Sequence, residues 1–374
     1  MEESDWSSDV CSSDLPLGLH PKAVSQIPSS LESEIKARAL SLGFTVCGIT
    51  TPDTLDFHHM YVNWLERGLN AGMTYLASAY HVSNRLHPEK FFPGLKSIIL
   101  LGYRYPLQHP AEIEEKTTGL ISGYASGKDY HHLIPNLASP LLQYLTALNP
   151  EAPAPRVYTD SAPVLERELA VRSGLGWIGR NSCLISPKHG SNLLLAEIFT
   201  AIALQADPPF AADHCGSCMR CVESCPTGCI LPERVIDANR CLSYHNIENK
   251  GMIPPEVMEK FGGWIFGCEI CQMVCPWNQR GYQSSSSIGI AGQMTVEEML
   301  EFLELSMDDF KSRFAETALA RARYNGLKRN VIIRLANLGE KNALGSIKRT
   351  EDTAELDWLR DTARWARNKI QLKK

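Results

Sequence analysis

Nine of the twelve cysteines in this chain lie between Cys215 and Cys275, and their spacing constrains the fold more than any other feature of the sequence. Eight of the nine form two runs with a single cysteine between them. The first run is Cys215-x2-Cys218-x2-Cys221-x3-Cys225-Pro226, the second is Cys268-x2-Cys271-x3-Cys275-Pro276, and Cys241 lies between the two. Such close spacing in a chain without a secretory signal predicts bound metal rather than disulfide bonds.

The two runs match the ligand pattern of proteins that bind two 4Fe–4S clusters as a bacterial ferredoxin does. In that fold the last cysteine of each run binds the other run's cluster. Cluster one is then bound by Cys215, Cys218, Cys221 and Cys275, and cluster two by Cys225, Cys241, Cys268 and Cys271. A pair of zinc sites with four cysteines each is the alternative, although zinc ribbons pair two C-x2-C knuckles instead. We expect Cys47, Cys183 and Cys229 to serve packing.

The charges of the chain are unevenly distributed. Residues 311–374 carry 16 Lys and Arg against 7 Asp and Glu, whereas residues 1–310 carry 21 against 35. A basic end on an acidic chain suggests a polyanionic partner, and a solvated helical surface is the plainer alternative. No uncharged apolar run reaches the roughly 18 residues of a membrane span, and no signal peptide is visible, so we expect a cytoplasmic protein without a membrane partner.

The composition divides the chain into a tail and three regions. Residues 1–28 are rich in Ser and Asp without periodicity, so we expect a disordered, non-native tail. The pattern then predicts an α/β (α+β) catalytic domain at 29–205, a ferredoxin-like domain at 206–282 and a short, basic, all-α region at 290–374 that resembles HEAT repeats. Because electron transfer alone needs far fewer residues, we expect the first domain to use the electrons in a reaction.

Apolar periodicity places the main elements within these regions. Strands are predicted at 44–50, 97–103, 156–160 and 193–200, and helices around 61–67, 134–148 and 164–173 of the first domain and around 330–338 and 356–370 of the last. Gly174, Gly176 and Gly179 match the G-x-G-x-x-G pattern of dinucleotide-binding sites, but the segment before them is charged and helical rather than a buried strand. The end of a helix followed by a close-packed turn explains these glycines better than a dinucleotide-binding site does.

Several segments resemble the epoxyqueuosine reductase family. The longest is TDSAPVLERELAVRSGLGWIGRNSCLI at 159–185, ahead of the cysteine runs. The others are ISGYASGKDYHHLI at 121–134, HCGSCMRCVESCPTGCI at 214–230, RCLSYHNIENKG at 240–251 and IFGCEICQMVCPWN at 265–278. The resemblance extends over roughly residues 30–340 in the expected order.

This resemblance implies a cytoplasmic oxidoreductase that modifies tRNA. The family reduces epoxyqueuosine to queuosine at the wobble position of tRNA anticodons, as the last step of queuosine biosynthesis. The implied cofactors are cobalamin, bound by the first domain, and two 4Fe–4S clusters that reduce it. The implied partners are a tRNA anticodon stem-loop that carries epoxyqueuosine and an external one-electron donor, and we expect a monomer.

The family's proton-donor position falls on Asp160. Taken alone, Asp160-Ser-Ala-Pro predicts a helix N-cap, whereas the resemblance favours a catalytic acid. Donating a proton at neutral pH would require burial to raise the pKa of Asp160.

Positions that resemble the family's cofactor contacts are candidate corrin ligands, although each could equally be a packing or surface residue. They are Arg85, Ser122, Asp160, Leu184, Leu195, Ser243 and Glu269. The chain lacks the D-x-H-x-x-G motif of histidine-ligated cobalamin proteins, because no glycine follows Asp129-Tyr-His131 at the required place. We therefore expect cobalamin to bind with its base detached.

The resemblance also implies tRNA contacts at Lys250, Arg321, Arg323, Lys328 and Arg329. Two alternatives to the family function stay open on the sequence. One is a reductive dehalogenase, which combines cobalamin with two clusters but usually has a twin-arginine export signal and no basic lobe. The other is a ferredoxin-like electron carrier with an appended domain.

Overall fold

The computed structural model describes residues 30–53, 56–107, 118–281 and 292–373. The predicted tail at residues 1–28 lies outside these residues, as does the predicted boundary between the second and third regions near 282–290.

A four-stranded antiparallel sheet forms the frame of the first region. Its order is β1 (Val46–Thr50), β2 (Ser97–Arg104), β7 (Leu193–Thr200) and β4 (Arg156–Tyr158). The register pairs Ile49 with Ile99 and Leu101 with Ala196. All four predicted strands are confirmed in position, because the apolar runs of β2 and β7 suit central strands that are buried on both faces.

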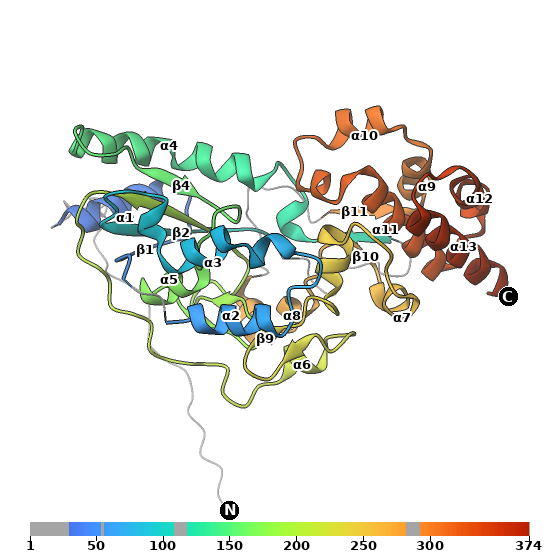
Figure 1. The fold of residues 1–374 in the computed structure, drawn as a ribbon, viewed down its shortest axis with the longest axis horizontal. Helices are drawn as coiled ribbons and strands as arrows, with labels where there is room; N and C mark the ends of the chain where they lie inside the picture. Colours follow the sequence, from blue (N-terminus) through green and yellow to red (C-terminus); the bar gives the residue numbers. More distant parts are fainter. Residues whose placement is uncertain (1–29, 54–55, 108–117, 282–291, 374) are drawn as a thin grey trace, which may run out of the picture.

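Helices cover the two faces of this sheet (Figure 1). On one face, α1 (Leu31–Ser41) and α4 (Tyr130–Leu148) pack against Ile99, Leu101 and Ile198. On the other, α5 (Glu166–Arg172) packs against Leu100 and Phe199. α2 (His58–Glu66) lies beyond α5 in Figure 1 and contacts α3 (Ala79–Leu86). Successive residues of a strand point to opposite faces, so the same strand serves both cores.

The glycine triplet confirms the packing interpretation. α5 ends at Arg172, and Gly174 follows with a φ of +77°, a left-handed conformation that favours glycine. A Cβ atom on Gly176 would lie 2.0 Å from the carbonyl oxygen of Ile185. Ile185 belongs to β6 (Leu184–Ile185), which pairs with β5 (Trp177–Ile178) directly after the turn.

A second sheet takes one strand from each predicted region. β3 (Thr118–Ile121) pairs in parallel with β10 (Trp264–Phe266) and antiparallel with β11 (Gln293–Thr295). The three predicted regions therefore share packing rather than lying apart, and their boundaries stay predictions.

The cysteine-rich segment consists of short elements. They are α6 (Arg220–Glu223), β8 (Ile230–Leu231), β9 (Val235–Ile236), the π-helix η5 (Tyr244–Glu248), α7 (Pro255–Met258) and α8 (Ile270–Met273). α6 and α8, which hold cysteines of the two runs, contact each other. The Gln272 side chain ties α8 to the first sheet, because its amide nitrogen lies 3.1 Å from the Tyr105 hydroxyl and its oxygen accepts from Ser191 at 3.0 Å.

The C-terminal region is helical, as predicted, and its helices gather at the right of Figure 1. They are α9 (Val296–Glu304), α10 (Met307–Phe314), α11 (Arg323–Leu338), α12 (Leu344–Thr353) and α13 (Asp357–Leu372). Their core includes Leu327, Val331 and Ala363 and continues onto Ile121 of β3. Among the residues described, no helix combines the length and apolar character that crossing a membrane requires.

Arg329 is buried inside this region, which contradicts the prediction that it contacts tRNA. Its side chain is 0% exposed. The guanidinium donates to the backbone carbonyls of Asn249 at 2.9 Å, Gly251 at 2.8 Å and His245 at 2.7 Å. A buried cation needs such partners to offset its lost hydration, and here the carbonyls of the 245–251 segment supply them.

Replacing Arg329 should therefore destabilise the fold. We expect Arg329→Ala to lower the free energy of unfolding by about 3 kcal/mol, because three buried carbonyls lose their donor. Lys328→Ala, one residue away on a partly exposed side chain, should change it by less than about 0.5 kcal/mol. Denaturant unfolding of both variants checks this, and equal stability of the two would contradict a structural role for Arg329.

Candidate active site

Asp160 lies in a loop directly after β4 and is held in an uncommon backbone conformation. Its φ of +56° is rare for a residue with a side chain and signals a constrained position. α5 begins six residues later, at Glu166, with Leu165 as its N-cap. The helix-cap interpretation of Asp160 is therefore wrong, because its side chain bonds elsewhere.

The Asp160 carboxylate accepts contacts from two distant elements. The Tyr130 hydroxyl donates from α4 at 3.0 Å, and His131 Nε2 lies 3.4 Å away. Arg321 Nη1 donates at 3.1 Å from the 3-10 helix η8 (Ala318–Ala322). Arg321 also binds Glu248 of η5, Nε to Oε1, at 2.6 Å. Residues of the first and third predicted regions thus meet at this carboxylate, and Glu248 of the second region is joined to it through Arg321. The Asp160 side chain is still 46% exposed and open to a substrate.

These partners make Asp160 a stronger acid than expected. Burial raises the pKa of Asp160, but hydrogen bonds from His131 and Tyr130 and the charge of Arg321 outweigh it and hold the pKa at about 2. The expected rise in the pKa of Asp160 depends on burial against cobalamin, so it stays a prediction. Asp160 is a carboxylate at neutral pH as long as these donors surround it.

Side chains with raised pKa values lie around Asp160 instead. The hydrogen bond to Asp160, together with Asp129 at 2.7 Å from Nδ1, raises the pKa of His131. On the other side, Glu166 Oε1 accepts from the backbone nitrogen of Asp160 at 2.6 Å. Burial and then the charge of Asp160 raise the pKa of Glu166 to about 7. Burial also raises the pKa of Glu197, a fully buried residue of β7.

A cavity of about 610 Å³ opens beside this cluster. Asp160, Glu166 and Arg85 line it, together with apolar side chains of α2 and α5 and residues of the 210–213 and 234–236 segments. Arg85 is 9% exposed, and its guanidinium lies over the Tyr61 ring at 5.0 Å. Of the candidate corrin contacts, the structure thus brings together Arg85 and Asp160.

The other candidate corrin contacts do not line this cavity. Ser122 and Glu269 lie in a second buried place, where Glu269 Oε1 accepts from the backbone nitrogen of Gly123 at 3.0 Å. Ser122 Oγ and Glu269 Oε2 have no hydrogen-bond partner within the part of the chain that the structure describes. Leu184 and Leu195 pack in the core under α5, and Ser243 precedes η5 half-buried.

The cysteines of the two runs differ in their surroundings. The first run lies in an exposed stretch, since residues 211–220 are exposed apart from Cys215 and Cys218. Burial and the nearby thiols of Cys275, Cys215 and Cys218 raise the pKa of Cys221. Burial raises the pKa of Cys268 to about 12, and the thiols of Cys241 and Cys225 contribute. The neighbours of Cys221 and Cys268 belong to their predicted sets, whereas burial and thiols that include Cys183 and Cys221, which lie outside its set, raise the pKa of Cys271.

Three cysteines outside these sets were predicted to pack. Burial raises the pKa of Cys47 to about 12 and that of Cys183 to about 11, which suits inert thiols. Cys229 is buried with its sulfur 3.4 Å from that of Cys225. Nowhere in the described residues do three His, Cys, Asp or Glu side chains gather closely enough to hold a single metal ion. A cubane needs a wider ring of sulfurs, because each thiolate binds a different iron.

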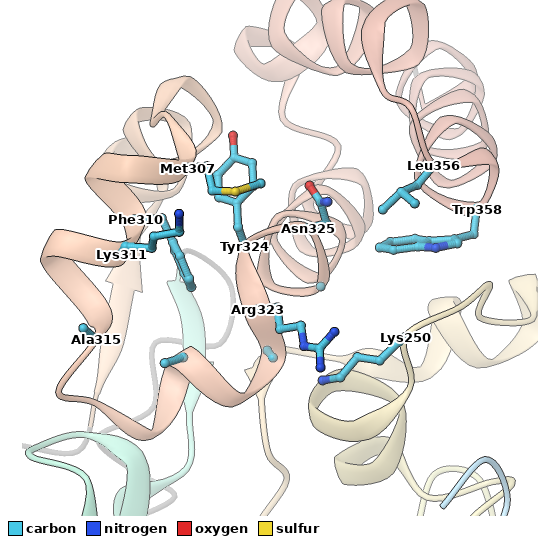
Figure 2. A pocket seen from close by; sticks show the side chains of 13 residues that line it. Lys250, Met307, Phe310, Lys311, Ala315, Arg323, Tyr324, Asn325, Leu356 and Trp358 are labelled. Carbon is cyan, nitrogen blue, oxygen red and sulfur yellow. The ribbon is translucent and has the colours of Figure 1, made fainter.

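Among the remaining candidate tRNA residues, Arg321 binds Asp160 directly. Lys250 Nζ donates to the carbonyl of Arg321 at 2.7 Å, and burial lowers its pKa to about 8. Arg323 is exposed, with a φ of +59°, and its side chain lies beside that of Lys250 in the pocket of Figure 2. Lys328 Nζ lies 3.3 Å from the Tyr324 hydroxyl.

Sequence reasoning missed several residues of this cluster. Tyr130 and His131 lie in the KDYHH segment and Glu166 in VLERE, both of which carry the family resemblance, yet no role was assigned to them. That local signal could have identified them. Glu248 lies in the RCLSYHNIENKG segment, which also carries the resemblance, but its contact with the distant Arg321 could not be inferred from that segment.

Comparison with known proteins decides the family. Residues 85–161 match the sequence profile described as "Epoxyqueuosine reductase QueG, DUF1730", and residues 214–278 match that of a "4Fe-4S double cluster binding domain". An epoxyqueuosine reductase from Cellulophaga algicola is 38% identical over 299 residues, which is 79% of this chain and 95% of that protein. The chain belongs to the epoxyqueuosine reductase family.

Solved structures of epoxyqueuosine reductases share the fold along most of the chain. The enzyme from Streptococcus thermophilus has a TM-score of 0.81 at 30% identity and covers 92% of this chain with 91% of its own. An epoxyqueuosine reductase solved with an epoxyqueuosine-modified stem loop of tRNA-Tyr has a TM-score of 0.81 at 27% identity, covering 91% and 90%. Family membership argues against the dehalogenase and the simple electron carrier, and the cluster-binding profile argues against zinc.

The coupling between Asp160 and His131 can be tested directly. Because the bond to Asp160 is the largest cause of the raised pKa of His131, we expect Asp160→Asn to lower that pKa toward the usual value of about 6.5. An NMR titration of the ring nitrogens measures it. His189, whose pKa burial lowers and which has no contact with Asp160, serves as the control. An unchanged His131 pKa would mean that the two side chains are not paired in solution.

Proposed function

We propose that this protein reduces epoxyqueuosine to queuosine at the wobble position of tRNA anticodons, with cobalamin and two 4Fe–4S clusters as cofactors. The observation that carries the proposal is membership of the epoxyqueuosine reductase family over 79% of the chain. The hydrogen-bonded and ion-paired surroundings of Asp160, at the family's proton-donor position, support it.

The cluster ligands follow the crossed pattern of the two runs. Cluster one would be held by Cys215, Cys218, Cys221 and Cys275, and cluster two by Cys225, Cys241, Cys268 and Cys271. The contact between α6 and α8 supports the crossing, because it brings the two runs side by side. The exposed stretch around Cys215 and Cys218 suits the entry of electrons from an external donor.

The buried polar atoms near the second run fit a cobalamin site. Glu269 lies between Cys268 and Cys271, and among the described residues neither its Oε2 atom nor the Ser122 hydroxyl has a hydrogen-bond partner. Such atoms could bind polar groups at the edge of a corrin. Arg85 and Asp160, which line the 610 Å³ cavity, would contact it as well. Leu184, Leu195 and Ser243 lie outside that cavity and would be further contacts. When bound and reduced, cobalamin supplies a strongly reducing, nucleophilic centre.

The residues around Asp160 would deliver protons. Removing the epoxide oxygen as water, which leaves an alkene, consumes two electrons and two protons. Asp160 is held as a carboxylate, so it must receive a proton before it can donate one. His131, 3.4 Å away with a raised pKa, is the neighbour suited to provide it. Tyr130 and Arg321 fix the carboxylate in position.

The tRNA partner would approach over the C-terminal region. Arg321 binds Asp160, Lys250 donates to the Arg321 carbonyl, and Arg323 and Lys328 follow Arg321 in the region 311–374, which carries the excess of Lys and Arg. The helices of this region would act as a HEAT-like support. Since the substrate is tRNA, the protein would work in the cytoplasm, as a monomer.

One reaction tests both the function and the role of Asp160. We expect the reconstituted protein, incubated anaerobically with cobalamin, a reductant and an epoxyqueuosine stem-loop, to yield queuosine by nucleoside mass spectrometry. Asp160→Asn should lower turnover by about 100-fold or more while stem-loop binding persists. The exposed Asp361→Asn serves as the control. Absence of product with the unaltered protein would contradict the function, and full turnover by Asp160→Asn would contradict its role.

Iron content tests the cysteine assignment. We expect Cys241→Ala to lose about four iron atoms per chain, because cluster two loses a ligand. Cys229→Ala removes a neighbouring buried sulfur that we assign to packing and should retain all the iron. Iron analysis together with the visible absorbance of the clusters measures both. Loss of iron from the Cys229 variant alone would reverse the two assignments.

A further inference from the structure

The indole of Trp177 donates a hydrogen bond to one of the cysteines assigned to cluster one. Trp177 belongs to β5, and its Nε1 atom lies 3.4 Å from the sulfur of Cys215. The bond joins the first predicted region to the second. An indole N–H can only donate, and a cysteine sulfur accepts more strongly as a thiolate than as a thiol. The geometry therefore suits a sulfur that is bound to iron.

Aromatic rings from the cysteine segment hold this indole in place. Trp177 is 3% exposed. The Phe210 ring stacks on it with the ring centroids 5.7 Å apart, and the rings of His214 and Trp277 each meet it edge-on at 5.0 Å. His214 directly precedes the first ligand of cluster one, and Trp277 follows the last ligand closely. The direction of the N–H bond is thus fixed by packing.

The same packing brings the first and last ligands of cluster one together. Trp177, Ile185 and Cys275 form one buried group, and Cys215 packs against it. The crossed ligand pattern requires cysteines from different runs to bind one cluster. These residues therefore fit a 4Fe–4S cluster, and the Trp177 indole would donate to one of its ligand sulfurs.

We propose that the Trp177 N–H raises the reduction potential of cluster one and so favours the entry of electrons. The inference rests on the proposed function, in which an external donor supplies one electron at a time. Reduction adds one electron to the cluster, and no proton moves and no bond forms or breaks. The reduced cluster carries one more negative charge, so a hydrogen bond to the sulfur of Cys215 stabilises the reduced form more than the oxidised form.

The sign of the effect separates this hydrogen bond from simple shielding. Residues 211–214 and 216–217, on either side of Cys215, are exposed. A smaller ring in place of Trp177 could admit water to the cluster, and water also stabilises the more charged, reduced form and raises the potential. Loss of the N–H lowers the potential. A lower potential after removal of the indole therefore identifies the hydrogen bond.

Potentiometry followed by EPR spectroscopy tests this inference in the reconstituted holoprotein. Trp177→Phe is the variant of choice, because Trp177 also lines the 610 Å³ cavity and a ring there keeps its wall. We expect the equilibrium constant for reducing one of the two clusters to fall by about fivefold, because one hydrogen bond is lost. For a one-electron couple this is a shift of about 40 mV to lower potential. The potential of the other cluster should not change.

Trp277→Phe is the matched control. It removes an indole from the same group of rings, and in the described part of the chain the N–H of this indole has no hydrogen-bond partner. The backbone nitrogen of residue 277, which hydrogen-bonds the Cys275 thiol, stays in place. We expect both potentials to equal those of the unaltered protein. An unchanged or raised potential in Trp177→Phe, or an equal fall in the two variants, would overturn the inference.

A second measurement guards against a folding defect in Trp177→Phe. Pulsed EPR of the reduced holoprotein, made with tryptophan that carries nitrogen-15 in the indole, should show an indole nitrogen coupled to a cluster. The coupling should persist in Trp277→Phe and disappear in Trp177→Phe. A lack of coupling in the unaltered protein would also overturn the inference. If that protein holds both clusters and converts its substrate, only the hydrogen bond is disproved, whereas absence of the clusters would contradict the proposed function as well.

Discussion

The buried Arg329 guanidinium determines how the C-terminal helices are attached to the rest of the molecule. It binds carbonyls of His245, Asn249 and Gly251 and so fixes the segment that follows Cys241. That segment carries Glu248 and Lys250, which both hold Arg321. Arg321 in turn binds Asp160. The position of the candidate proton donor therefore depends on a cation that has no contact with it.

The surroundings of Asp160 serve positioning at the expense of proton donation at neutral pH. Three donors and a left-handed backbone hold the carboxylate in one place, and the same donors favour its charged form. A residue in this state has no proton to donate at neutral pH. Proton delivery is then a property of the group of side chains, because the pKa values of His131 and Glu166 are both raised.

The sequence was sufficient to predict the features that depend on residues close together in the chain. The four strands were predicted from apolar runs, and the binding of two 4Fe–4S clusters was predicted from the spacing of the cysteines. Both signals lie within a few residues of each other in the chain. Arg329 was misassigned because an arginine among other basic residues predicts a surface, and its partners lie about 80 residues away in the chain. The donors that lower the pKa of Asp160 could not be foreseen for the same reason, since Arg321 is remote in sequence.

The second sheet has a consequence for how the protein is made. β3 is synthesised early but pairs with β10 and β11, which emerge much later. Non-local pairing of this kind slows folding, and the strand edges stay open until the partners arrive. The cysteines of both runs are translated before β11 closes the sheet. Iron–sulfur assembly factors would thus meet a nascent chain whose cysteine segment is complete while its supporting sheet is not.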